Sequence, residues 1–100
     1  MIVRYEPAAR EEVIEAVRWY VDVAGVFVAD AFERELDAAV RLLMRFPRLG
    51  APGPHASRGL RLDGFPYTLH YRLDGDSIRI LAVANQRRRP GYWRGRSSGR

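Results

Sequence analysis

The residues best suited to chemistry lie at the end of the chain, where arginines surround two aromatic residues. Residues 87–100 hold six of the 17 arginines, the aromatic residues Tyr92 and Trp93, and no acid. Residues 1–86 carry 11 arginines against 12 carboxylates, so the net charge of +5 comes from this last segment. Guanidinium groups make bidentate contacts with carboxylate and phosphate, and a localised positive field attracts acidic surfaces. The segment therefore predicts binding to an acidic partner, whose chemistry the charge alone does not choose.

The aromatic residues around these arginines have two possible roles each. Tyr92 and Trp93 are predicted to pack on the sheet or the helices and so to pin the C-terminus, with target contact as the alternative. Trp19 lies about 150° around its predicted helix from the apolar stripe, taking 100° per residue. An exposed tryptophan suits a partner anchor, although the C-terminal segment could also cover it. Arg87–Arg89 follow a predicted strand directly, which indicates presentation on a rigid end, with a solvated charge run as the alternative.

Other chemistry finds little support in the sequence. The chain has no cysteine, and His55 and His70 have no carboxylate at ligand spacing, so we expect no metal site and no cofactor. No Gly-rich phosphate loop, nucleophile elbow or paired-acid motif occurs. The carboxylates of Glu11, Glu12 and Glu15 fall in the first turns of a predicted helix, where its dipole explains them.

The first half of the chain predicts a strand and two helices. A short strand at residues 2–5 precedes Pro7, a residue that fits the first turn of a helix. Apolar residues recur at helical spacing over residues 8–24, with Val13, Val17, Tyr20, Val21 and Ala24 directed inward. Gly25 separates this helix from a second at residues 26–46, and so short a turn predicts an antiparallel hairpin. Residues 47–54 contain three prolines and two glycines, so we expect a loop without regular structure there.

The second half predicts strands at residues 58–63, 67–73 and 77–85, with a turn at residues 74–76. In the last strand, Ile78, Ile80, Ala82 and Ala84 are expected on one face and Arg79, Leu81 and Val83 on the other. The fold class is therefore α+β, in the order β-α-α-β-β-β, with an N-terminal helical hairpin packed on a small, mainly antiparallel sheet. We expect one domain over residues 1–96 and a disordered basic tail over residues 97–100. With no signal-like or long apolar segment, a cytoplasmic protein without membrane contact is expected.

Several motifs in this order resemble the ParE/RelE toxin superfamily, and its ParE branch in particular. They are Trp19-Tyr20, Phe32, Phe65-Pro66-Tyr67, Tyr71-Arg72 and the block Arg87-Arg88-x-Pro90-x-Tyr92-Trp93-x-x-Arg96. The resemblance implies the toxin of a type II toxin–antitoxin module, held inactive by an antitoxin. It further implies that a ParE-like toxin poisons DNA gyrase, whereas RelE-like relatives cleave messenger RNA on the ribosome.

The sequence departs from both branches in two places. A basic strand position of the RNA-cleaving relatives falls at Thr68, so the set of groups for charge stabilisation and proton transfer is incomplete. Many ParE-like chains place a histidine before the arginine pair, where this chain has Asn85-Gln86, which leaves the role of that imidazole open.

Three functions follow from the resemblance and these departures. The leading hypothesis is a non-enzymatic toxin that binds gyrase. The runner-up is a ribosome-dependent endoribonuclease, in which Arg61, Arg87 and Arg88 hold phosphate and Tyr92 assists proton transfer. The third is a degenerate toxin that only binds its antitoxin or DNA. The residues predicted to contact a target or antitoxin are Trp19, Arg61, Arg72, Arg87, Arg88, Arg89, Tyr92, Trp93 and Arg96.

The expected partner is an acidic, partly helical antitoxin with apolar residues for the sheet and hairpin and carboxylates for the arginines. Direct DNA binding is not expected except through the antitoxin, because the charge outside the tail is slightly negative and no helix has a basic face.

Overall fold

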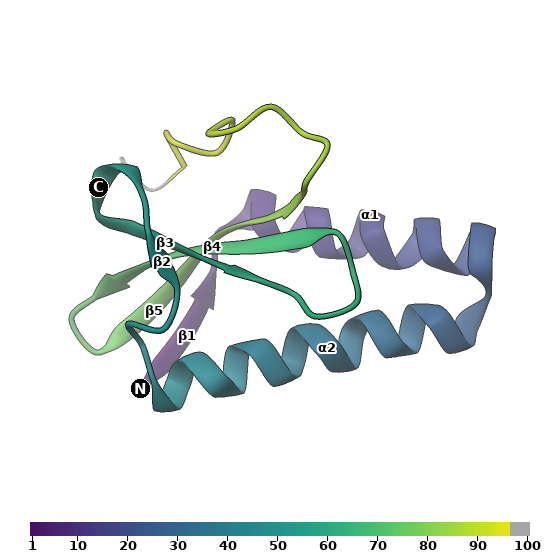
Figure 1. Ribbon diagram of the computed structural model, residues 1–100, viewed down its shortest axis with the longest axis horizontal. Helices are drawn as coiled ribbons and strands as arrows, with labels where there is room; N and C mark the ends of the chain where they lie inside the picture. Colours follow the sequence, from purple (N-terminus) through teal and green to yellow (C-terminus); the bar gives the residue numbers. More distant parts are fainter. Residues whose placement is uncertain (97–100) are drawn as a thin grey trace.

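Two helices pack on one face of a five-stranded sheet in the computed structural model, which describes residues 1–96 (Figure 1). The elements in chain order are β1 (Ile2–Tyr5), α1 (Pro7–Ala24), α2 (Val26–Arg45), β2 (Ala51–Pro52), a short 3₁₀ turn η1 (Pro54–Ala56), β3 (Ser57–Arg61), β4 (Tyr67–Asp74) and β5 (Ser77–Asn85). This confirms the α+β class and the predicted order of the main elements. The loop at residues 47–54 was predicted to lack regular structure. This is wrong at residues 51–52, which form β2, and at residue 54, where η1 begins. The predicted tail at residues 97–100 lies outside the described residues.

A single glycine ends α1 and begins α2. Gly25 has a φ of 91°, a conformation that side-chain-bearing residues rarely adopt. Its N–H donates to the Tyr20 and Val21 carbonyls at 3.0 and 3.1 Å, and its own carbonyl accepts from Ala29 N at 3.2 Å. The chain reverses direction within one residue, so the helices form the predicted hairpin.

The sheet order is β1-β5-β4-β3-β2, with β1 parallel to β5 and all other pairs antiparallel. The parallel pair joins strands that are distant in the chain, because the helical hairpin and the three strands β2, β3 and β4 lie between β1 and β5. β1 pairs with β5 only as far as Tyr5 opposite Ile80. The edge of β5 from Leu81 to Asn85 is therefore left without a neighbouring strand.

A β-bulge in β5 changes which residues face the helices. His70 pairs with Ala82, but Tyr71 pairs with Ile80, so Leu81 is an extra residue on this strand. Beyond it, Val83 joins the core under the helices, whereas Leu81, Ala82 and Ala84 form a second cluster. The predicted face of Leu81 is confirmed, whereas those of Ala82, Val83 and Ala84 were wrong, because strict alternation takes no account of a bulge.

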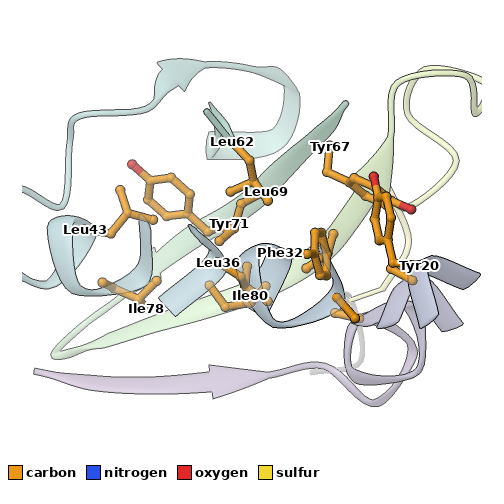
Figure 2. Close-up of a cluster of buried hydrophobic side chains, with 14 residues drawn as sticks. Tyr20, Phe32, Leu36, Leu43, Leu62, Tyr67, Leu69, Tyr71, Ile78 and Ile80 are labelled. Atoms are coloured by element: carbon orange, nitrogen blue, oxygen red, sulfur yellow. The ribbon is translucent and has the colours of Figure 1, made fainter. Parts of the chain in front are cut away.

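The larger core lies between the helices and the sheet and is rich in aromatic residues (Figure 2). Phe32 of α2 is fully buried, with ring centroids 5.1 Å from Tyr67, 5.4 Å from Tyr20 and 5.5 Å from Phe65. Offset and edge-to-face pairs of this kind add stability beyond the area that they bury. This cluster fixes α1, α2 and the start of β4 against one another.

The tip of the hairpin projects past the sheet (Figure 1). For this reason Val21 and Ala24, predicted to face inward, are exposed, as are Val23 and Phe27. The buried stripe of α1 instead runs through Ala9, Ala16 and Tyr20, with Val13 and Val17 partly buried beside it.

Buried Tyr71 holds the loop after α2. Its hydroxyl donates to the Pro47 carbonyl at 2.6 Å and accepts from Gly50 N at 3.0 Å. Gly50 lies so close to the ring that a Cβ there would stand 2.8 Å from Tyr71 Cε1. One phenol thus connects β4 to a segment more than twenty residues away in the sequence.

Candidate binding site

The C-terminal segment, residues 86–96, folds back onto the sheet in a series of tight turns. Backbone N–H groups of residues 88, 92, 94 and 96 each donate to the carbonyl three residues earlier, at 3.0 to 3.3 Å. At its start, Gln86 N donates to the Pro66 carbonyl at 2.9 Å, and the Asn85 side chain accepts from Arg87 N at 2.9 Å. The segment lies on the side of the sheet away from α2 (Figure 1).

Trp93 is the apolar anchor of the segment. It is 4% exposed and packs with Leu81, Ala82 and Ala84 on the sheet face opposite the larger core. Its ring stacks on that of His70, with centroids 4.3 Å apart and planes 25° apart. This burial lowers the pKa of His70, an effect that the Glu12 carboxylate partly opposes. The predicted packing of Trp93 is confirmed.

A carboxylate on α1 supplies the polar anchor. Glu12 Oε2 accepts from the Tyr92 hydroxyl at 2.5 Å, and Glu12 Oε1 accepts from Arg96 Nη1 and from Val83 N, each at 2.9 Å. The Glu12 side chain is only 10% exposed, so its charge is stabilised by the Arg96 ion pair and by two further donors. We call these four residues the Glu12 clamp.

The clamp occupies the edge of β5 that β1 leaves uncovered. Val83 N has no strand partner there, and a buried N–H without an acceptor is costly. Glu12 provides the acceptor because α1 crosses this edge. The same carboxylate also accepts from the Tyr92 hydroxyl and the Arg96 guanidinium of the C-terminal segment. The interpretation of Glu12 as a residue of the helix dipole was therefore wrong, since it lies beyond the first turn and inside a contact network.

Tyr92 joins the clamp to the exposed arginines. The Arg88 guanidinium carbon lies 3.9 Å from the centre of the Tyr92 ring, within cation–π range. Burial and the hydrogen bond to Glu12 raise the pKa of Tyr92 well above its ordinary value of 10.0. The phenol is consequently protonated at neutral pH and acts as a donor.

A groove of about 500 Å³ runs between α1 and the start of the C-terminal segment. We call it the α1 groove. Trp19, Glu15 and the clamp residues Glu12 and Tyr92 line it from α1 and the C-terminal segment, together with Arg87 and Arg88. Trp19 is 55% exposed, so residues 1–96 leave it uncovered, and the predicted alternative of a tryptophan hidden by the C-terminal segment is wrong.

A second hollow of about 340 Å³ lies beneath the C-terminal segment itself. Trp93 and His70 line it, and Arg88 and Arg89 stand at its border. The two hollows share Asn85, Arg88 and Tyr92, so these residues lie between them.

Two predicted site residues lie apart from the others. Arg72 is near the far end of β4, where its Nε donates to the His55 carbonyl at 3.0 Å. Arg61 is exposed at the end of β3 and faces Gln86, whose amide oxygen in the favourable orientation accepts from Arg61 Nε and Nη2 at 3.2 and 3.1 Å. The structure therefore brings together Trp19, Arg87, Arg88 and Tyr92, sets Arg89 and Trp93 beside them, and places Arg96 within the clamp.

Sequence reasoning missed the contacts of Glu12 and the α1 groove that this residue helps to line. Glu12, Ala16 and Trp19 recur at helical spacing, which places an acid and an aromatic on one side of α1. That spacing was a signal for a shared surface, but the partners of Glu12 lie 71 to 84 residues away and gave no local sign.

Neither a metal-binding cluster nor a membrane-spanning helix is found in the part of the chain that the structure describes. Residues 1–96 contain no group of three or more histidine or acidic side chains that could hold a metal ion. None of the helices formed by these residues is long and apolar enough to cross a membrane.

Comparison with known proteins agrees with this fold. A solved structure described as the chromosomal ParDE toxin–antitoxin system from P. aeruginosa matches with a TM-score of 0.74 and 23% sequence identity, over 85% of this chain and 95% of that one. No curated protein sequence matches significantly. The family model of the ParE toxin of the type II toxin–antitoxin system parDE matches residues 3–90, and the chain therefore belongs to the ParE toxin family.

Proposed function

We propose that this ParE toxin acts by binding an acidic surface of a protein target through the cationic rim, which we define as Arg87, Arg88 and Arg89. DNA gyrase is the target that the family resemblance implies. An acidic antitoxin neutralises the toxin by binding the same molecule.

The rigid attachment of the segment that carries the rim is the observation that carries this proposal. All three side chains are exposed, yet the backbone is tied before them at Pro66 and after them by Tyr92, Trp93 and Arg96. A backbone that is already held in place loses little conformational freedom on binding, which improves affinity. This arrangement supports a docking surface more than a solvating tail.

The same contacts argue against the endoribonuclease. Tyr92 was the predicted proton-transfer group, but its hydroxyl donates to Glu12, so its proton is already engaged within the protein. Arg61 faces Gln86 instead of the rim. With Tyr92 engaged by Glu12 and Arg61 facing Gln86, the predicted catalytic groups do not converge, and this favours binding over cleavage.

A supercoiling assay with purified gyrase tests the proposal. The wild-type protein is expected to inhibit supercoiling, and the double variant Arg87→Gln/Arg88→Gln to need at least roughly tenfold more protein, because charge-assisted contacts contribute about 1.5–3 kcal/mol each. The matched control is Arg41→Gln/Arg45→Gln, which removes the same charge from exposed positions of α2.

Two outcomes would overturn the assignment. Defined cleavage ends on translated message, with supercoiling untouched, would establish the endoribonuclease. Unimpaired growth of cells that express the protein without an antitoxin, together with no effect on gyrase, would establish the degenerate toxin.

A further inference from the structure

We propose that the second hollow, beneath the C-terminal segment, binds a small phosphomonoester that carries a planar organic group. The inference goes beyond the proposed function, because it concerns a small ligand instead of a protein target. The hollow shares Arg88 and Arg89 with the cationic rim. A ligand bound there would therefore neutralise two of the three charges that the rim offers to its target.

The charged residues around this hollow have one sign. Among the described residues, those that line it include Arg88, Arg89 and Arg94 but no aspartate or glutamate. The α1 groove differs in this respect, since Glu12 and Glu15 line it. Three guanidinium groups around one hollow repel one another and attract an anion. The second hollow is therefore more cationic than the α1 groove.

The three guanidinium groups are not neutralised within the described part of the chain. The side chains of Arg89 and Arg94 have no hydrogen bond or ion pair to another residue of the range 1–96. Arg94 packs against Gly91, where a Cβ would stand 2.7 Å from the Arg94 Cζ atom. Arg88 is held over the Tyr92 ring, and its side chain has no hydrogen-bond acceptor in that range. The N–H donors of all three residues are thus available to an anionic ligand.

The number of cations favours phosphate over carboxylate. One carboxylate is satisfied by one bidentate guanidinium, whereas a phosphomonoester carries a charge of about −1.5 to −2 at neutral pH and offers three acceptor oxygens. Three arginines match that charge and that number of acceptors. The hollow of about 340 Å³ lies at the small end of the range for small-molecule pockets, roughly 300–1,000 Å³, and so suits a ligand of mononucleotide size.

The other walls of the hollow suit a planar organic group. Pro54, Ala84 and Trp93 supply apolar surface. The Thr68 hydroxyl and the Asn85 amide nitrogen also line the hollow, and neither has a hydrogen-bond acceptor among residues 1–96. Apolar walls with a few placed polar groups are typical of a small-molecule site. The phosphate would thus lie at the arginines and the organic group against the sheet.

Titration of the ¹⁵N-labelled protein with adenosine monophosphate tests the inference. The protein has two tryptophans, of which Trp93 lines the second hollow and Trp19 lines the α1 groove. The Trp93 indole N–H signal is expected to shift on binding and the Trp19 signal to stay in place. Adenosine and inorganic phosphate each supply only one part of the ligand, so each is expected to bind at least roughly tenfold more weakly.

Two single substitutions in the same segment locate the ligand. Arg94→Gln is expected to weaken the binding of adenosine monophosphate at least roughly tenfold, because Arg94 lines the second hollow. Arg87→Gln is the matched control, since it removes the same charge from a residue that lines the α1 groove and not the second hollow. Its effect on this binding should be about two- to threefold at most.

Two oligonucleotides separate the possible sources of the phosphomonoester. A free mononucleotide and the 5′-phosphate end of a single strand present the same chemistry. Equal binding of adenosine monophosphate and a 5′-phosphorylated oligonucleotide would assign the hollow to strand ends, and weaker binding of the oligonucleotide would assign it to free small molecules. An oligonucleotide without a terminal phosphate contains only phosphodiesters, so equally tight binding of this strand would overturn the proposal.

The outcomes also separate this inference from the proposed function. An unmoved Trp93 signal, equal binding of adenosine and adenosine monophosphate, or equal losses in Arg94→Gln and Arg87→Gln would overturn the assignment of the hollow, even if the protein inhibits gyrase. Selective binding of adenosine monophosphate by a protein that never inhibits gyrase would support the hollow and refute the proposed target.

Discussion

The two faces of the sheet are covered in different ways. The helix face buries a continuous aromatic and aliphatic core, in which Phe32, Leu43 and Tyr71 are completely excluded from solvent. The opposite face is covered by one short segment, which one buried ring and one carboxylate hold in place. The first kind of cover determines whether the chain folds, whereas the second determines where the arginines lie. Stability and binding should therefore be separable by mutation.

Phe32→Ala tests the helix face and is expected to have the largest effect. Removing this buried ring should lower the free energy of unfolding by about 3–5 kcal/mol. Urea unfolding followed by circular dichroism measures this loss. Phe27→Ala is the control, because that ring is 85% exposed and its loss should cost less than about 0.5 kcal/mol. Similar losses in both variants would contradict the assignment of the core.

Trp93→Ala tests the opposite face. We expect a loss of about 2–3 kcal/mol, less than for Phe32, because the segment can detach without opening the larger core. Trypsin should then cut after Arg87 and Arg88 at a urea concentration where the wild type resists. If the variant lost its helical circular dichroism at that concentration, the two faces would not be separable.

Glu12→Gln tests the clamp alone. The amide still accepts from Val83 N but loses the charge that pairs with Arg96, so a loss of about 1–3 kcal/mol is expected, with faster hydrogen exchange at residues 92–96. The pKa of Tyr92 should also fall toward 10.0, because one of its causes is removed while burial remains. Ultraviolet titration of tyrosine measures this change. Glu15→Gln, on the same helix but exposed, should leave the pKa of Tyr92 unchanged.

Acidification tests the stacking of His70 on Trp93 and should have the smallest effect. The folded protein has a lowered pKa at His70, so the unfolded chain takes up the proton first as the pH falls below about 6.5. The free energy of unfolding should therefore decrease as the pH falls from about 6.5 to the folded pKa of His70. His70→Phe keeps a ring and should lose this dependence, whereas His55→Gln should keep it. A stability that rises on acidification would refute the lowered pKa.

The sequence was informative where a contact is local or periodic. Pro7 and Gly25 marked the ends of α1, and the alternation from Tyr67 to Leu73 predicted β4, because both signals are contained in neighbouring residues. The bulge at Leu81 gave no such signal, since it is set by pairing with β4 and by the cover that Trp93 provides.

The site was predictable in its parts but not in its assembly. The basic and aromatic composition identified the C-terminal segment, and the helical angle of Trp19 placed it outside the core. The Glu12 clamp depends on which strand edge is left open after β1 ends, a property of sheet topology that no local pattern contains. The same topology places Arg72 away from the rim.

The Glu12 clamp joins the beginning of the chain to its end, and this has a consequence for synthesis. Every residue of the larger core precedes residue 84, so that core can form while Tyr92 and Arg96 are still absent. Until these two residues have been made, Glu12 has only Val83 as a partner within the clamp, and the arginines have no fixed position. A product interrupted before Tyr92 would thus fold around its aromatic core and still lack an ordered binding edge, so the proposed binding surface is completed only when residues 92–96 have been made.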